Sequence, residues 1–77
     1  MFQYKWVDYI AGETIPEAAV IIAPGPLYMA RLQLTGQTNI LYGFYQPSAD
    51  FAYFPEEGYN AGMLEKTEFE IFTIIAA

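Results

Sequence analysis

The sequence predicts an all-β fold, a small antiparallel sheet or sandwich of about six short strands, in one domain over residues 1–77. Short segments alternate polar and apolar residues, clusters of Gly and Pro separate them, and no window carries an apolar stripe at helical spacing. The chain is too short for a second core, because a domain of this size buries only about 60% of its unfolded surface.

The first expected strand covers residues 2–10. Phe2, Tyr4 and Trp6 alternate with polar residues, which is the pattern of a half-buried strand with these aromatic rings on its apolar face. Gly12 ends the strand, because glycine favours the backbone conformations of turns.

A hairpin is expected next. The apolar run 18–23 and residues 27–34 are separated by residues 24–26, Pro-Gly-Pro, where two prolines supply no backbone donor and bend the chain. We expect the run to begin with a turn at Pro16 rather than a helix, since β-branched residues follow at once. The second strand is expected to bury one face, made of Tyr28, Ala30, Leu32 and Leu34.

The C-terminal half predicts three further strands. Residues 40–46 form the first, with Gly43 in its middle, where a glycine signals a bulge or a close approach of backbones. Residues 51–54 form a short strand, and a polar loop is expected at 56–62. Residues 68–75 form the last strand, which alternates at its start and is apolar on both faces near its end.

The composition indicates that a partner covers part of the surface. Hydrophobic residues make up 55% of the chain, aromatic residues 18% and charged residues 16%, which is more apolar than a typical soluble domain. A small domain cannot bury so much, and monomers rarely expose apolar patches beyond a few hundred Å². We therefore expect a homodimer or a higher even-numbered oligomer.

Charge and hydropathy argue against two classes of partner. The net charge is −6, and the only cationic side chains are Lys5, Arg31 and Lys66, so no basic stripe can neutralise the phosphates of a nucleic acid. The longest apolar runs, 18–23 and 71–77, fall short of the roughly 20 residues of a transmembrane helix. No signal peptide is recognisable, which favours a cytoplasmic location without excluding secretion by another route.

Catalytic chemistry has few suitable groups. The chain holds no His, no Cys and one serine, Ser48, so a nucleophile lacks its usual base and an imidazole or thiolate zinc site cannot form. Asp50, Glu56 and Glu57 could serve as a glycosidase pair or as calcium ligands, but they lack the spacing of a calcium loop and are typical of a solvated surface. We expect a protein that is not an enzyme and uses no cofactor or metal.

Arg31 is the only arginine, and it stands within an otherwise apolar strand. A charge is costly there unless it is paired. Either it forms a salt bridge with Glu65, Glu68 or Glu70, or its planar donor fork contacts a ligand or partner.

Aromatic residues offer a second set of candidates. Tyr42 and Tyr45, with Phe44 between them, point to opposite faces of one strand, and such rings are more typical of a core or an interface than of a sugar platform. Trp6 suits an interface or sugar stacking equally, and its alternating strand favours packing.

A series of short motifs spans most of the chain. Trp6 precedes a Gly-to-Ala segment with a central proline at residues 12–19, which has one residue more than the pattern Gly-x-x-Pro-x-x-Ala. The later motifs are Leu-Tyr-Met-Ala-Arg at 27–31, Gly43-Phe44, Pro47, Tyr-Phe-Pro at 53–55, Gly-x-x-Glu at 62–65 and Phe-Glu-Ile-Phe at 69–72. In order and spacing they resemble a single DM9 repeat, a β-rich unit known from mannose-binding animal lectins.

The resemblance implies a non-catalytic, carbohydrate-binding module for mannose-type glycans. Members of that family usually carry two tandem repeats, so two chains are expected to pair by two-fold symmetry. Phe44 stands where the family has a sugar-binding lysine, and the loop 23–26 lacks the family's acid, which favours the alternative of a structural or protein-interaction protein without sugar binding. The expected ligand contacts are Arg31, Tyr42, Tyr45 and Glu65, and the expected subunit contacts are Trp6, Phe44 and Phe72.

Overall fold

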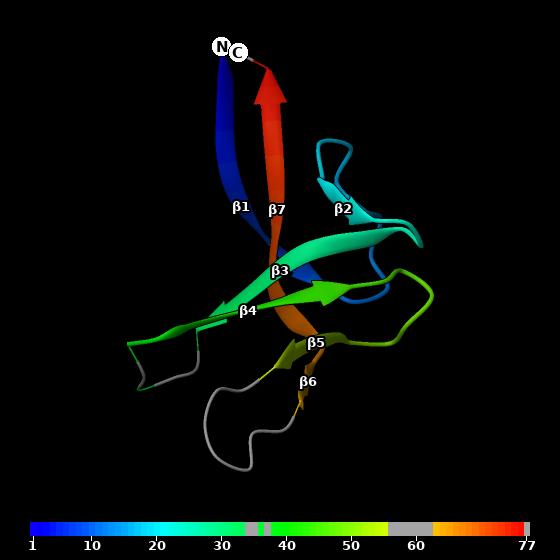
Figure 1. Cartoon of the computed structure of the whole chain (residues 1–77), viewed down its shortest axis with the longest axis vertical. Coiled ribbons are helices and arrows are strands. Elements are labelled where there is room, and N and C mark those ends of the chain that lie inside the picture. The colour runs from blue at the N-terminus through cyan, green and yellow to red at the C-terminus, as the bar shows by residue number, and fades with distance from the viewer. Residues whose placement is uncertain (34–35, 37, 56–62, 77) are drawn as a thin grey trace.

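The computed structural model describes residues 1–33, 36, 38–55 and 63–76, and the regular elements among these residues are all β-strands (Figure 1). In chain order they are β1 (Phe2–Ile10), β2 (Ile21–Ala23), β3 (Leu27–Gln33), β4 (Ile40–Tyr45), β5 (Ala52–Pro55), β6 (Met63–Lys66) and β7 (Glu68–Ala76). No helix long and apolar enough to cross a membrane is found in the described part of the chain.

The strands form one open, seven-stranded sheet in the order β1-β7-β3-β4-β5-β6, with β2 paired to β3 outside this path. All of the pairings are antiparallel. The predicted all-β antiparallel class is therefore confirmed. One strand more is present than expected, because β6 pairs with β5 over four residues. The loop predicted at 56–62, with Glu56 and Glu57, lies outside the described residues.

β7 lies between β1 and β3 in the sheet. Along one edge it pairs with the whole of β1, from Phe2↔Ala76 to Ile10↔Glu68. Along the other edge it meets β3 and then the segment before β2, where the Val20 amide donates to the Phe72 carbonyl at 3.1 Å. In Figure 1 the β1–β7 ribbon extends away from the other strands, and both chain ends lie at its tip.

The hairpin predicted around the Pro-Gly-Pro segment is confirmed. Ile21 pairs with Tyr28 and Ala23 with Leu27. The strand part is shorter than expected, because residues 18–20 pair with β7 instead of β3. The turn expected at Pro16 is also present, since the Ala19 amide donates to the Pro16 carbonyl at 3.0 Å.

The core lies on one face of the sheet. Its fully buried apolar side chains come from five strands and are at most 5% exposed: Tyr9, Ala30, Tyr45, Ala52, Phe54, Phe69 and Ile71. Tyr28 and Leu32 pack against this cluster, so the face predicted to be buried on β3 is confirmed at the described positions. Thr73 is buried at the rim of the core, where its hydroxyl donates to the Lys5 carbonyl at 2.7 Å.

Gly43 allows β4 and β5 to cross closely, as the sequence predicted. A Cβ atom at this position would lie 1.9 Å from the Tyr53 carbonyl oxygen and 2.9 Å from a ring carbon of Phe54. Both distances are far below van der Waals contact, so only a residue without a side chain fits.

The apolar face predicted for β1 is wrong at its N-terminal end. Phe2 is 63% exposed and Tyr4 70% exposed, whereas Tyr9 is 4% exposed. Pairing with β7 places Tyr9 opposite Phe69 and Val7 opposite Ile71, which puts the odd-numbered residues of β1 on the core face. The alternation identified the two faces of the strand, but its partner strand determined which of them is covered.

Candidate functional site

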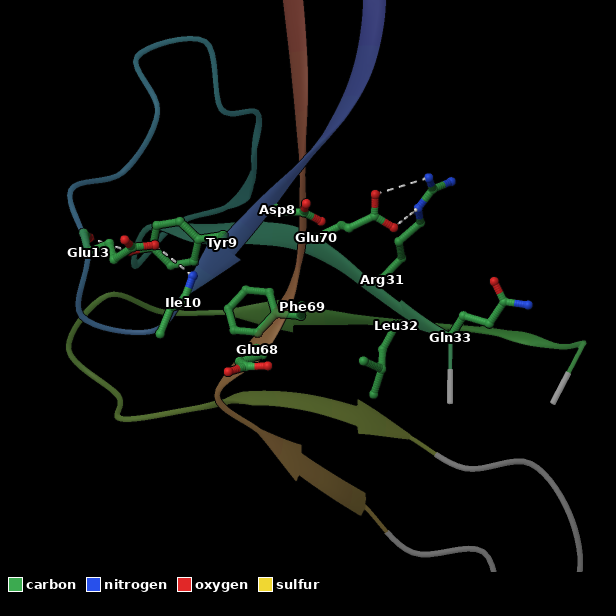
Figure 2. Close-up of a pocket in the computed structure, with 10 residues that line it drawn as sticks. All are labelled: Asp8, Tyr9, Ile10, Glu13, Arg31, Leu32, Gln33, Glu68, Phe69 and Glu70. Atoms are coloured by element: carbon green, nitrogen blue, oxygen red, sulfur yellow. Dashed lines mark hydrogen bonds and ion pairs between the residues drawn. The ribbon is translucent and has the colours of Figure 1, made fainter. Parts of the chain in front are cut away.

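β3 and β7 pair briefly and then separate, which leaves a cleft between them. The paired residues are Ala30↔Ile71 and Arg31↔Glu70, while β3 continues along β4 as far as Gln33. The cleft holds about 520 Å³, within the range of roughly 300–1,000 Å³ that is common for small-molecule sites. Figure 2 shows its lining, to which β1, β3, β7 and the turn after β1 contribute.

Arg31 lies at the rim of this cleft and forms a forked ion pair with Glu70 (Figure 2). Its Nε donates to Glu70 Oε1 at 2.9 Å, and its Nη2 donates to Oε2 at 3.4 Å. The hydrogen bond to Glu70 raises the pKa of the Arg31 guanidinium, although partial burial acts in the opposite direction. Of the three salt-bridge partners that the sequence left open, the structure selects Glu70.

Aromatic rings support the guanidinium. The Arg31 Cζ atom lies 4.6 Å from the centroid of the Trp6 ring, within the range of a cation–π contact. Trp6 also lies 4.9 Å from the Phe72 ring and 6.0 Å from the Tyr42 ring. Tyr42 remains 56% exposed, so part of this aromatic group is open to solvent beside the ion pair.

The pairing register explains how these groups meet. Asp8 lies opposite Glu70, Glu70 opposite Arg31, and Arg31 opposite Tyr42. Four neighbouring strands therefore present one row of side chains on the face away from the core. Two carboxylates directly opposite each other would repel, and the guanidinium next to Glu70 offsets that repulsion. We call these four residues the polar row.

The cleft beside the polar row has a mixed lining. Glu13, Glu68 and Gln33 add polar groups, and Leu32 and Phe69 supply apolar surface. Carboxylates outnumber the single guanidinium, so the local field disfavours anionic ligands. Among the described residues, no three acidic side chains come together in a way that could hold a metal ion.

Tyr9 closes the inner side of the cleft. Its ring packs 5.5 Å from Phe69 and 5.4 Å from Tyr45, and its hydroxyl donates to the Glu13 carbonyl. Burial raises the pKa of the Tyr9 phenol well above its ordinary value of 10.0, and the hydrogen bond with Tyr45 adds to the shift. Tyr9 is therefore a neutral, fixed wall of the cleft at physiological pH.

The structure brings together only some of the ligand contacts expected from the sequence. Arg31 and Tyr42 are neighbours in the polar row. Tyr45 is 1% exposed in the core, where its hydroxyl accepts a hydrogen bond from the Gly12 amide at 3.2 Å. Glu65 lies on β6 opposite Tyr53, at the far end of the strand order from β1. We therefore leave Tyr45 and Glu65 out of the site proposed below.

The expected subunit contacts fall in two places. Trp6 and Phe72 pack together at a tilted angle beside the polar row. Phe44 contacts the Tyr53 ring at 5.6 Å and lines a second hollow of about 430 Å³, which shares Tyr42 with the polar row and whose other residues are Ile22, Met29, Gly43 and Pro55. Phe44 thus lies in an almost wholly apolar depression.

Sequence reasoning missed Asp8 as a member of the site. Asp8 reaches the polar row only through the β1–β7 register, which pairs it with a residue 62 positions further along the chain. The alternation of β1 did place it on the same face as Trp6, and this was the only local signal available.

Comparison with known proteins returned nothing for this chain: no family model, no curated protein and no solved structure matches it.

Proposed function

We propose that this chain is a non-catalytic binding module, that it takes a carbohydrate at the polar row and the adjoining cleft, and that it acts as a homo-oligomer. The observation that carries the proposal is the polar row itself. Asp8 and Glu70 offer acceptors, Arg31 offers guanidinium N–H groups beyond the two that bond Glu70, and Tyr42 offers an exposed ring with a hydroxyl. Sugars need this combination, because their hydroxyls both donate and accept while their C–H faces pack on aromatic rings.

Charge supports a neutral polyol over other small ligands. The cleft is lined by one guanidinium, that of Arg31, and by the four carboxylates of Asp8, Glu13, Glu68 and Glu70. Phosphates, nucleotides and organic acids would meet net repulsion there. A mannose-type glycan is the specific expectation, which comes from the resemblance to the DM9 repeat.

A glycan array followed by calorimetric titration tests the carbohydrate site. Arg31→Ala is expected to weaken glycan binding by roughly tenfold or more, because a hydrogen bond to a charged group contributes about 1.5–3 kcal/mol. Arg31→Lys keeps the charge but loses the fork, so we expect binding intermediate between wild type and Arg31→Ala.

Glu65→Gln is the control for charge alone. Glu65 is exposed on β6, away from the polar row, and its replacement is expected to leave glycan affinity unchanged. Absence of binding to every glycan by the wild-type protein would refute the carbohydrate proposal. An equal loss in Glu65→Gln and Arg31→Ala would refute its location.

A second candidate function is that of a structural or protein-interaction protein without sugar binding. The apolar hollow around Phe44 favours it, because the resembling lectins have a lysine at that position. Under this proposal a Phe44→Lys variant would lose a protein contact and change the assembly state in light scattering. Under the carbohydrate proposal the same variant keeps its assembly state and still binds glycan, since all four residues of the polar row are retained and Phe44 borders the row only through Tyr42.

A further inference from the structure

The free edge of β1 is a feature that the ligand site does not use. β1 is the first strand in the sheet order, and among the described residues only β7 pairs with it. An unpaired edge offers a row of amide and carbonyl groups to any strand that can lie beside it. The question is which residues of β1 carry those free groups.

Hydrogen bonds around β7 identify the residues of β1 whose backbone groups face the free edge. The Ala11 amide donates to the Thr67 carbonyl at 2.8 Å, and these two residues continue the β1–β7 register by one position beyond Ile10↔Glu68. In an antiparallel pair such bonded positions alternate with unbonded ones, so the odd-numbered residues of β1 direct their backbone groups toward β7. The bond from the Thr73 hydroxyl to the Lys5 carbonyl agrees with this assignment.

The even-numbered residues therefore face the free edge. Ile10 is already occupied, because its amide donates to Glu13 Oε1 at 2.9 Å and its carbonyl accepts from the Glu13 amide at 3.1 Å. Glu13 thus caps the C-terminal end of the edge. Phe2, Tyr4, Trp6 and Asp8 are left with outward backbone groups.

The same residues carry an exposed aromatic stripe. Phe2 and Tyr4 are 63% and 70% exposed, and the Tyr4 ring stacks on Phe72 of β7 at 6.0 Å with 8° between the ring planes. Trp6 continues the stripe against Phe72. A strand laid along this edge would therefore gain backbone hydrogen bonds and cross-strand aromatic contacts together.

The chain exposes more surface than a compact monomer of its mass. The accessible surface is 5416 Å², whereas a compact monomer of this mass has roughly 4,700 Å². The radius of gyration is 12.8 Å, against about 11.5 Å for a compact domain of this length. The excess surface, about 700 Å² per chain, is close to the roughly 800 Å² per partner of a standard interface.

We propose that a second copy of this chain covers the edge, with β1 pairing antiparallel to the partner's β1 around a two-fold axis at Tyr4. This places Phe2 opposite the partner's Trp6 and Tyr4 opposite the partner's Tyr4 on one face. On the other face Lys5 lies opposite the partner's Gln3. The two ribbons then form a continuous four-stranded sheet, β7-β1-β1-β7, which supports a tip that otherwise consists of two strands.

Symmetry limits the possible registers, and two observations exclude the registers centred on Lys5 and on Trp6. Two-fold symmetry requires each residue to meet one of the same parity, because paired residues share a face. Centring on Lys5 would oppose two ammonium groups, which is destabilising. Centring on Trp6 would require bonds from Ile10, which Glu13 already occupies. Centring on Tyr4 avoids both problems and uses the open end of the strand.

The inference specifies the homo-oligomer of the proposed function, and its test is separate from glycan binding. Because the chain has no cysteine, Tyr4→Cys introduces a single thiol at the expected axis. Hydrogen-bonded opposite residues lie about 5.5 Å apart at Cα, which suits a disulfide. We expect mild oxidation to convert Tyr4→Cys to a covalent dimer within the time that leaves most of Ile10→Cys monomeric. Ile10→Cys is the matched control, because Ile10 lies on the same strand and is 48% exposed but has no residue of the partner's β1 opposite it in this register.

The mass in solution tests the interface without a cross-link. We expect wild type to sediment at twice the 8.7 kDa of one chain at high concentration, and Tyr4→Lys to remain monomeric because two ammonium groups would meet at the axis. Ile21→Lys is the control, as Ile21 is 58% exposed away from β1, and it should still dimerise.

Each contrary result has a distinct meaning. A wild-type protein that stays monomeric over the whole concentration series would overturn both this interface and the homo-oligomer of the proposed function. A dimer that Tyr4→Lys leaves intact, or that Ile10→Cys cross-links as readily as Tyr4→Cys, would overturn the β1 interface alone. Neither result bears on glycan binding, which the Arg31 variants decide.

Discussion

Tyr9 and Tyr4 belong to the same strand and pair with the same neighbour, yet one is 4% exposed and the other 70%. Tyr9 packs against Tyr45 and Phe69, at the end of β1 where the sheet continues through β3, β4 and β5. The described ring contact of Tyr4 is with Phe72 alone. Tyr9 points to the core face and Tyr4 to the opposite face, at the end of the strand that has fewer neighbours. Burial on β1 therefore depends both on the face that a side chain occupies and on how many strands lie beyond β7, which divides β1 and β7 into a body end and a tip.

The body end should be least tolerant where β4 crosses β5. Gly43→Ala would place a methyl group 1.9 Å from the Tyr53 carbonyl oxygen, so the backbone must move, and we expect a loss of at least about 3 kcal/mol in unfolding free energy. Urea unfolding followed by circular dichroism measures this loss. Gly12→Ala has free space but a φ of 98°, and it should cost only about 1 kcal/mol. Equal losses would contradict the close crossing.

Two isoleucines on one face of β7 compare the body with the tip directly. Ile71 is fully buried and Ile75 is 40% exposed. We expect Ile71→Ala to lower the unfolding free energy by about 2–5 kcal/mol, and Ile75→Ala by about 1 kcal/mol or less. Thermal and chemical unfolding of both variants check the difference. Similar losses would mean that the tip is as well packed as the body.

Thr73 connects the two regions. Its buried hydroxyl donates to the Lys5 carbonyl at 2.7 Å, and Thr73→Val keeps the shape while leaving that carbonyl with one hydrogen bond fewer. We expect a loss of about 1 kcal/mol. In hydrogen exchange, the amides at the ribbon tip should exchange faster in this variant. Thr38→Val, at an exposed position, should stay within about 0.5 kcal/mol of wild type.

The smallest expected change in stability comes from Tyr9, and it occurs only at alkaline pH. Burial raises the pKa of its phenol above 10.0 in the folded state, so the folded protein keeps this proton to higher pH than the unfolded chain. The resulting stability is fully present below pH 10 and is lost as the pH rises above 10. Unfolding measured from pH 8 to 11 should show this decline in wild type, and Tyr9→Phe should decline less.

Much of the fold followed from local sequence features. The two prolines around Gly25 predicted the β2–β3 turn, and the alternation in β3 predicted its buried face at Ala30. Gly43 predicted the close crossing. These predictions succeeded because turn geometry and side-chain alternation depend on neighbouring residues only.

The candidate site was predictable only in part. The isolated charge of Arg31 predicted either an ion pair with one of three glutamates or a contact with a ligand or partner, and the β3–β7 register selected Glu70. Asp8 joined the polar row through the β1–β7 register. Tyr45 is of a residue type that is common in ligand contacts, but its side chain is buried in the core.

The sequence by itself determined that the chain forms short antiparallel strands, where one hairpin turns, and that Arg31 is an isolated charge in an apolar strand. Only the tertiary structure decided which face of β1 is covered, which carboxylate meets Arg31, and that β3 and β7 separate to leave a cleft. The physical reason is the range of the interactions. Alternation and turns are set within a few residues, whereas register and burial depend on pairings between residues as far apart as Phe2 and Ala76.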